Sequence, residues 1–383
     1  MSGPDEIIAE RPHLRLMDGQ RICACWTSTC PAAGWAEWSQ DQGRTWVRGH
    51  WEEDGFCDAG GVIHRSVLAG FQPGLALTYR IHTRPIRSFG PYRVDFGEVD
   101  GLLTGVMNPL RDAAGTFSFV MLNDVHGDPE ITDHLLSFVR SPVSFAVLNG
   151  DWVDFLEDDE SIRQGIMEPF ARISERLHVP LRFLRGNHET RGAAARRLRS
   201  YLLLPGERYY GASTLAGVRM LFLDTGGDKA DGHPEYSGLV DFDHYLSVQC
   251  EWLRKELDSP AWQQARVRLL FLHLPPRVTL LDGSVFETPL PRHQRLFQLL
   301  ASSRADLAFA GHLHRAGNDD AGARRPYPLV IGGGGSGELR ERRDILQLPT
   351  LTHCTVTERR LAVRQIDWNG NTQFHREVSL GEK

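Results

Sequence analysis

The sequence predicts an α/β protein that is preceded by a smaller all-β region. Apolar runs of strand length recur between residues 117 and 331, and amphipathic helical patterns separate several of them. Between residue 13 and about residue 100, strand candidates and turn signals follow one another closely. The chain has 383 residues, which is more than one typical domain holds. We therefore expect two domains, at 1–108 and 109–383.

Five of the apolar runs end abruptly in polar residues that can bind metals. They are Phe117–Leu122 before Asn123-Asp124-Val125-His126, Phe145–Leu148 before Asn149-Gly150-Asp151-Trp152-Val153-Asp154, Leu181–Leu184 before Arg185-Gly186-Asn187-His188-Glu189, Val267–Leu272 before His273, and Leu307–Ala310 before Gly311-His312-Leu313-His314. In an open α/β sheet, ligands bind beyond the carboxyl ends of the strands. Oxygen and imidazole ligands suit divalent metal ions. The pattern therefore indicates a metal site at one sheet edge.

Taken together, the five motifs resemble those of a known superfamily. In order they are D-x-H from Asp124, G-D-x-x-D from Gly150, G-N-H-E from Gly186, a lone His273, and G-H-x-H from Gly311. Each motif alone is weak, because Asp and Asn are common turn formers. Their order is similar to that in the calcineurin-like metallophosphoesterase superfamily, over roughly residues 116–337. The resemblance implies a four-layer αββα sandwich for this part of the chain.

The resemblance also implies a dinuclear metal centre. It places Asp124, His126, Asp151 and His314 on the first ion and Asp151, Asn187, His273 and His312 on the second, with Asp151 as the bridge. These ligands suit two divalent ions, which could be manganese, iron or zinc. Such a centre would hydrolyse a phosphomonoester or a phosphodiester by attack of a metal-bridging hydroxide. The expected enzyme is a metal-dependent phosphoric ester hydrolase, either a phosphatase or a phosphodiesterase.

The same resemblance gives catalytic roles to two residues that are not ligands. His188 would protonate the leaving oxygen or steady the transition state, and Asp154 would orient its ring. Asp154 stands where purple acid phosphatases carry the tyrosine that binds ferric iron, so we do not expect a purple centre. The D-R-G of phosphoprotein phosphatases is also missing, because Phe155 follows Asp154. Arg191 and Arg315 are the predicted substrate-binding replacements, with solvated or structurally paired arginines as the alternative.

The all-β region resembles a fibronectin type III domain, which purple acid phosphatases carry in the same place. The resemblance rests on the tyrosine-corner pattern of Leu68, Phe71, Pro73-Gly74 and Tyr79. The region contains five tryptophans, Trp26, Trp35, Trp38, Trp46 and Trp51. We interpret them as core filling with one or two surface rings, and the alternative is a carbohydrate platform. It also contains four cysteines, Cys23, Cys25, Cys30 and Cys57. We interpret them as small buried or free thiols, and the alternative is a zinc site.

The remaining elements follow from periodicity and turn residues. Helices are expected at 131–139, 159–177 (kinked or broken at Pro169), 193–203, 245–257 and 292–300. Strands are expected at 21–26, 34–38, 45–47, 62–68, 75–81, 218–223, 329–331, 352–356, 361–366 and 373–378. Residues 97–115 are expected to form a linker, and the glycine run at 332–337 is interpreted as a mobile turn, with close approach to the substrate as the alternative.

Composition narrows the class of function. A net charge of −6 gives no general attraction to nucleic acid or to an anionic membrane. No apolar run approaches the length of a membrane span, and the polar, acidic stretch Met1–Arg15 has no apolar core of signal-peptide length. We therefore expect a cytoplasmic protein that acts on a small phosphoester, has no membrane partner and is unlike nucleic-acid binders, with its oligomeric state open.

Two alternative functions fit the same motifs. The first is a metal-dependent nuclease, which the lack of a Lys/Arg stripe disfavours. The second is a non-catalytic binding scaffold on the same fold. A scaffold would be expected to have lost ligands, whereas all seven expected ligand positions carry suitable residues.

Overall fold

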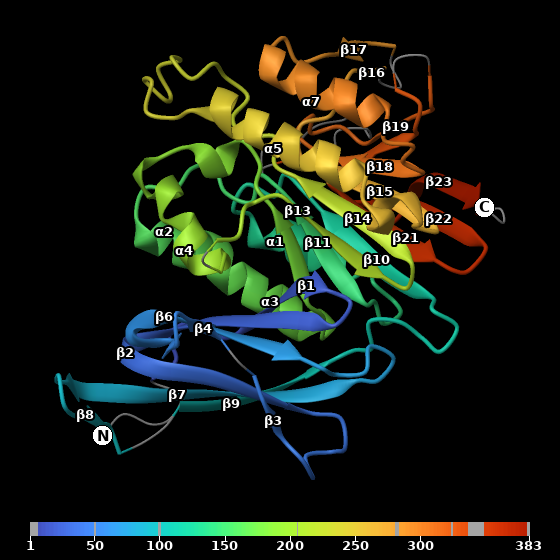
Figure 1. Cartoon of the computed structure of the whole chain (residues 1–383). Coiled ribbons are helices and arrows are strands. Elements are labelled where there is room, and N and C mark those ends of the chain that lie inside the picture. The colour runs from blue at the N-terminus through green and yellow to red at the C-terminus, as the bar shows by residue number, and fades with distance from the viewer. Residues whose placement is uncertain are drawn as a thin grey trace.

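The computed structural model describes residues 7–49, 51–98, 101–204, 206–279, 283–322, 325–335 and 348–380. In the larger part of the chain, two sheets face each other and helices cover their outer faces, while the N-terminal strands lie to one side (Figure 1). This α/β architecture, with an all-β region in front, confirms the predicted fold class.

Strands outnumber helices among the described residues. The strands are β1 (His13–Asp18), β2 (Arg21–Ser39), β3 (Val47–Arg48), β4 (Glu52–Glu53), β5 (Phe56–Cys57), β6 (Ala59–Ala69), β7 (Leu77–Phe89), β8 (Val94–Phe96), β9 (Gly101–Met107), β10 (Phe117–Leu122), β11 (Phe145–Asn149), β12 (Leu181–Leu184), β13 (Gly211–Leu215), β14 (Val218–Leu223), β15 (Val267–Leu272), β16 (Val278–Thr279), β17 (Val285–Phe286), β18 (Leu307–Ala310), β19 (Gly317–Asp319), β20 (Leu329–Ile331), β21 (Thr350–Val356), β22 (Arg360–Asp367) and β23 (Thr372–Ser379). The α-helices are α1 (Pro129–Leu136), α2 (Asp159–Ile162), α3 (Glu168–Leu177), α4 (Leu198–Leu202), α5 (Phe242–Leu257), α6 (Pro260–Gln263) and α7 (Pro291–Ala301).

The first sheet places three motif-bearing strands side by side. Its order is β23-β22-β21-β10-β11-β12-β1-β2-β7-β8, and β10, β11 and β12 are parallel neighbours. Because side chains alternate along a strand, Phe119 of β10 packs between the sheets against Phe145 and Phe271, with ring centroids 4.9 and 5.6 Å away. Its neighbours Val120 and Leu122 belong to the core on the other side of the sheet, beneath α1 and α3.

The second sheet brings the two later motifs to the same edge. Its order is β13-β14-β15-β18-β20-β19, and β14, β15, β18 and β20 run parallel. Phe222, Phe271 and Phe309 form a stacked row on its inner face, with adjacent centroids 4.9 Å apart. On its outer face, Leu270 shares a core with residues of α5 and α7. The strands at 117–122, 181–184, 218–223, 267–272, 307–310 and 329–331 have the predicted bounds.

The N-terminal strands continue the first sheet. Strand β1 pairs in parallel with β12 and antiparallel with β2. Two strands were expected at 21–26 and 34–38, but β2 is one long strand whose register shifts after Thr27, so that its first part pairs with β6 and its second part with β7. The expected linker at 97–115 is also wrong in part, because it contains β9, which pairs with β7. The boundary at 108 and the fibronectin-like character stay predictions.

Two expected helices are interrupted. The helix at 159–177 divides into α2, a π-helical turn at Arg163–Met167 and α3, whose first turn contains Pro169. Proline has no N–H to donate, and it follows directly on the π-helical turn, where the regular α-helical hydrogen bonding is already interrupted. The helix at 193–203 consists of a 3₁₀ turn at Ala193–Arg196 and the short α4. None of the described helices is long and apolar enough to cross a membrane.

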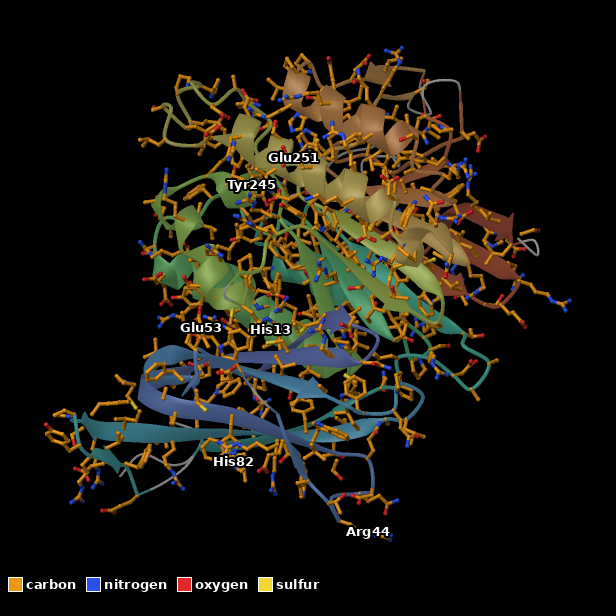
Figure 2. All side chains as sticks on the ribbon, viewed as in Figure 1. His13, Arg44, Glu53, His82, Tyr245 and Glu251 are labelled. Carbon is orange, nitrogen blue, oxygen red and sulfur yellow. The ribbon has the colours of Figure 1, made fainter. Side chains whose placement is uncertain are left out.

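Two of the five N-terminal tryptophans, Trp26 and Trp38, are buried, and the carbohydrate platform stays an alternative prediction. Trp26 is buried and donates from Nε1 to Thr83 Oγ1 at 2.8 Å. On the surface, Trp35 is already stacked on His82, whose position Figure 2 marks, with centroids 4.7 Å apart. The Cys23 and Cys25 sulfurs lie 3.7 Å apart in the interior, and no cysteine among the described residues belongs to a candidate metal-ligand group.

His13 of β1 is a buried histidine without hydrogen bonds. Figure 2 marks its position. Its ring lies edge-on to Phe170 of α3, with centroids 5.7 Å apart, and neither ring nitrogen has a hydrogen-bond partner. Burial lowers the pKa of His13 to about 3, and the nearby Arg15 charge adds to the effect.

We expect this histidine to make the fold sensitive to acid. The folded-state pKa of about 3 lies below the ordinary 6.5, so between those values the unfolded chain binds the additional proton. The stability contribution is therefore present above pH 6.5 and is lost as the pH falls toward 3. His13→Leu should lose less of its urea midpoint than the wild type when the pH is lowered over this range. His375→Leu, at an exposed position, is the matched control. Equal losses in His13→Leu and the wild type would contradict the prediction.

Candidate metal centre

The predicted ligands sit on strained turns directly after the strands. Five of the seven adopt the left-handed backbone conformation, with φ of 52° at Asp124, 52° at His126, 54° at Asp151, 70° at His312 and 50° at His314. Left-handed backbone costs a non-glycine residue about 1–2 kcal/mol. Such strain persists only where the surrounding structure enforces it, and it concentrates at functional sites.

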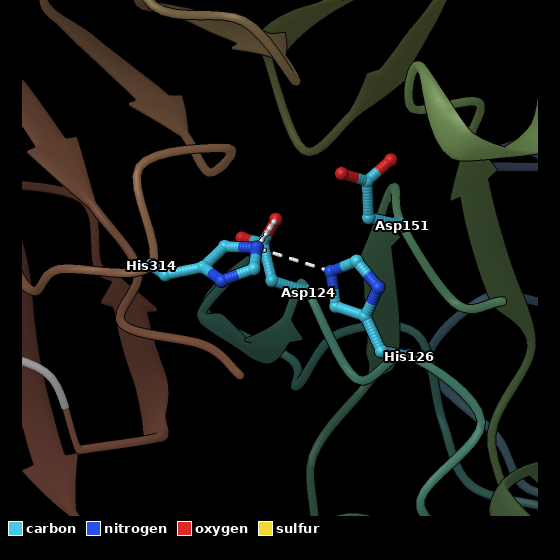
Figure 3. A group of neighbouring side chains, drawn as sticks. All are labelled: Asp124, His126, Asp151 and His314. Atoms are coloured by element: carbon cyan, nitrogen blue, oxygen red, sulfur yellow. Dashed lines mark hydrogen bonds and ion pairs between the residues drawn. The ribbon is translucent and has the colours of Figure 1, made fainter. Parts of the chain in front are cut away.

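The first ligand group joins both sheets. Asp124, His126, Asp151 and His314 each offer a ligand atom, and these atoms lie within 4.8 Å of one another (Figure 3). The two Nε2 atoms of His126 and His314 face each other at 3.0 Å, and His314 Nε2 lies 3.6 Å from Asp124 Oδ1. Figure 3 shows these side chains converging from loops on opposite sides. Such a convergence fits a single ion between them.

A second ligand group shares Asp151 with the first. The ligand atoms of Asp151, His273 and His312 also lie within 4.8 Å of one another. His273 Nε2 is 3.0 Å from Asp151 Oδ2, while its Nδ1 donates to the main-chain oxygen of Asn149 at 2.7 Å. The amide of Asn187 lies at this group as well, with its Oδ1 2.9 Å from His312 Nδ1. All seven predicted ligand residues are thus brought together in two groups.

The electrostatics of these groups are dominated by burial and by the carboxylates. Burial works against charge on both Asp151 and His273, but their mutual attraction outweighs it. This attraction lowers the pKa of Asp151 and raises the pKa of His273 to about 10. Burial lowers the pKa of His312 to about 3 and also lowers the pKa of His314. Neutral imidazoles of this kind are suited to metal ligation.

His188 and Asp154 lie beside the first group, but not in the expected relation. The carboxylate of Asp154 bonds His126, with Oδ1 2.7 Å from Nδ1. It is 3.9 Å from His188 Nδ1, which donates to the main-chain oxygen of Asp154 at 2.9 Å. Asp154 therefore fixes the ring of His188 through its backbone, and its side chain orients a predicted ligand. Burial lowers the pKa of His188, and the charge of Arg191 adds to this.

The two predicted substrate-binding arginines differ in position. Arg191 reaches the site, with Nη1 2.9 Å from His188 Nε2. Two carboxylates that the sequence interpretation gave no such role hold it there: Asp228 lies 3.3 Å from its Nη2 and Glu235 2.9 Å from its Nε. Arg315 is half-buried next to His314 in the sequence. Arg191 is thus paired structurally, and the substrate role of both arginines stays a prediction.

Glu189, the last residue of the G-N-H-E motif, ties two ligand loops together. Its fully buried carboxylate accepts the main-chain N–H groups of Asp151 at 3.0 Å, Trp152 at 2.6 Å and Gly186 at 2.7 Å. Burial raises the pKa of Glu189 to about 7, and the charge of Asp151 adds to this. The motif itself was the available signal, but sequence reasoning gave this residue no role.

The glycine run after β20 is a packed support for the first motif. Gly332 to Gly335 are buried, and Gly335 donates its N–H to the main-chain oxygen of Asp124 at 2.8 Å. A Cβ at Gly332 or Gly334 would collide with Asn123 or Asp124. The mobile turn expected for this run is therefore wrong over 332–335, where glycine lets two backbones approach. Ser336 and Gly337 lie outside the described residues.

Comparison with known proteins gives the family. Residues 117–316 match the sequence profile of the calcineurin-like phosphoesterases, which is more than half of the 383 residues. The chain belongs to this family. All five motifs of this calcineurin-like phosphoesterase lie inside the matched segment. No curated protein matches the sequence significantly.

Two solved structures share the fold over nearly the whole chain. A purple acid phosphatase from yellow lupin (Lupinus luteus) seeds is 16% identical, with a TM-score of 0.62 over 96% of this chain and 74% of that one. A structure of PhoD is 12% identical, with a TM-score of 0.60 over 97% of this chain and 92% of that one. At these identities the similarity establishes the fold and leaves the substrate open.

We expect Glu189→Gln to destabilise the protein markedly. The amide would turn an NH₂ group toward main-chain donors that now share two carboxylate oxygens. A buried donor without a partner costs about 1–3 kcal/mol. Urea unfolding should show a loss of this size, whereas the exposed Glu157→Gln should stay within about 0.5 kcal/mol of the wild type. A Glu189→Gln midpoint equal to that of the control would show that the three bonds are dispensable.

Proposed function

We propose that the protein is a dinuclear metal-dependent phosphoesterase that hydrolyses a phosphomonoester or a phosphodiester. The observation that carries the proposal is a pair of fully buried carboxylates, Asp124 and Asp151, without a lysine or arginine partner among the described residues. In the described ranges, their ion-pair neighbours are His188, His273 and His314. Buried charges are paired or coordinate metals, so this site has a need for cations that metal ions would meet.

The donor atoms fit divalent ions of the manganese, iron and zinc type. Asp124, His126, Asp151 and His314 would hold the first ion, and Asp151, Asn187, His273 and His312 the second. Asp151 belongs to both groups, which is what a bridging carboxylate requires. A pair of bound ions would supply an activated water and offset the charge of the phosphate.

The residues around the ligands would complete the catalysis. Asp154 holds the Nδ1 side of His126, so that Nε2 is left for a metal. His188 has the corresponding arrangement, since Nδ1 donates to a carbonyl and Nε2 is directed to Arg191. We propose that a phosphate oxygen takes the place of His188 Nε2 as the partner of Arg191, and that a protonated His188 then serves the leaving oxygen.

The metal and the ester can be tested together. The protein is stripped with chelator, refilled with manganese and assayed on a chromogenic phosphomonoester and the matching diester. We expect two ions per chain and turnover of at least one ester, because the site offers two complete ligand groups. Asp151→Ala should lose both, since it removes the shared carboxylate. Turnover no higher than that of Asp151→Ala would contradict the phosphoesterase proposal and favour a binding scaffold.

His188 can be separated from the metal ligands. We expect His188→Ala to retain the metal content of the wild type, because neither of the two ligand groups that contain Asp151 includes His188, which is grouped only with His126 and Asp154. Its rate should fall about 10²–10⁴-fold, as is usual for loss of a general acid. The fall should be steepest for esters with poor leaving groups, which need the proton most. A His188→Ala protein that loses an ion would show that this histidine is a ligand.

A further inference from the structure

A second cavity lies beside the segment that carries Asn187 and His188. It has a volume of about 290 Å³ and is bounded by Arg185 and Thr190 of that segment, by the region around α4, by residues 207–209 and by the start of α5. None of the seven predicted metal ligands lines it. Tyr245, marked in Figure 2, lines it from α5. The cavity is therefore distinct from the metal centre.

The cavity wall has an excess of positive charge. Four arginines line it, against two carboxylates, those of Glu207 and Asp241. Both carboxylates are already engaged. Glu207 is paired with the buried Arg15 at 2.7 Å, and Asp241 accepts the N–H of His244 at 3.1 Å to cap α5. Glu207 thus already balances a buried cation, while the charge of Asp241 still leaves an excess of arginines along the wall.

Three of the lining arginines have no acidic partner among the described residues. Arg196 and Arg199 each donate to a main-chain carbonyl, at 2.8 and 3.4 Å, and Arg208 makes no ion pair within the described ranges. By contrast, Arg197 lies in the same stretch outside the cavity and is paired with Asp159 at 2.8 Å. The three arginines without an acidic partner in the described ranges thus line the cavity, whereas the paired Arg197 does not line it.

The interior behind the cavity adds further positive charge. A small inner cavity of about 20 Å³ shares Arg208 and Tyr209 with the larger one. Arg182 lines it, and burial together with the charge of Arg15 lowers the pKa of Arg182 to about 10. This inner space has room for little more than one water molecule. A ligand would therefore occupy the outer cavity, backed by buried positive charge.

The rest of the outer cavity is apolar. Leu203, Val240 and Phe242 line it, and Leu239 leaves 73% of its surface exposed there. The fourth lining arginine, Arg185, is neutralised by a buried carboxylate and packs its guanidinium over Tyr209 at 4.2 Å. A small inorganic ion would leave this apolar surface unused.

We propose that the cavity binds a small organic anion, with its phosphate, sulfate or carboxylate group against Arg196, Arg199 and Arg208 and its apolar body against Leu239 and Phe242. Charge-assisted hydrogen bonds from guanidinium to such groups are among the strongest available at a protein surface. The anion would be either a free effector or the far end of a substrate held at the metal centre.

The test is a calorimetric titration of the manganese-loaded full-length protein with phenylphosphonate. The phosphonate group can also bind at the metal centre, so we expect two sites in the wild type, of which one survives removal of the metal by chelator. Arg199→Gln/Arg208→Gln should weaken that surviving site about tenfold or more and leave the other unchanged. Both positions are exposed, so the fold should be kept.

The control variant is Arg197→Gln, which removes an arginine of the same stretch that does not line the cavity. It should keep both sites, and neutral benzyl alcohol should not match the affinity of phenylphosphonate. Binding that disappears entirely on chelation, or equal binding in the double variant and the control, would overturn the proposal. The readout does not require turnover, so it stands apart from the phosphoesterase proposal.

Kinetics then distinguish the two sources of the anion. If the cavity holds the far end of a substrate, the double variant raises KM for an ester with a second anionic group and leaves KM for 4-nitrophenyl phosphate unchanged. If the ligand is a free effector, phenylphosphonate changes the wild-type rate without competing with the substrate, and the double variant does not respond. Either result supports the cavity as an anion site.

Discussion

The burial of two carboxylates at the ends of neighbouring parallel strands is the constraint on which this structure depends. Asp124 and Asp151 are almost inaccessible to water, and within the described part of the chain only histidines stand close enough to balance their charge. In the absence of a cation, a proton shared with His273 is the available compensation, which is why the pKa of His273 is raised to about 10. Metal ions would take the place of that proton, so folding of this region and metal binding are linked.

The strain of the ligand turns is offset by packing around them. Left-handed backbone at Asp124 and Asp151 would relax if the loops were free. The two sheets prevent this, because the Asn149 side chain donates to the main-chain oxygen of Leu272 at 3.1 Å and the Asn123 side chain to that of Gly332 at 3.1 Å. Asn123 directly precedes Asp124, and Asn149 lies two residues before Asp151. Each asparagine therefore connects the loop of a predicted ligand to the opposite sheet. The site is therefore a property of the sheet-to-sheet contact.

The sequence predicted those parts of the molecule that local chemistry determines. Mainly apolar runs such as 117–122 and 267–272, with one polar residue each, have the predicted ends because a strand buried on both faces has little other choice of residues. Contacts made between distant segments were not predictable in this way. The pairing of β1 with β12 leaves no local pattern, and the ion pair of Arg15 with Glu207 joins residues 192 positions apart. The carboxylate of Asp154 bonds His126 rather than His188 because of the turn geometry, which the motif does not specify.

One short segment connects the metal centre with the arginine-lined cavity. Asn187 and His188 lie at the metal centre, while Arg185 and Thr190 line the cavity on the other side. Thr190 Oγ1 donates to the main-chain oxygen of Asn187 at 2.6 Å, so a hydrogen bond joins a residue of the cavity wall to the backbone of a predicted metal ligand. An anion that shifted this segment would change metal affinity, and by thermodynamic linkage the metals would change anion affinity by the same factor. The architecture thus gives the two sites a physical route for coupling that requires no movement of the sheets.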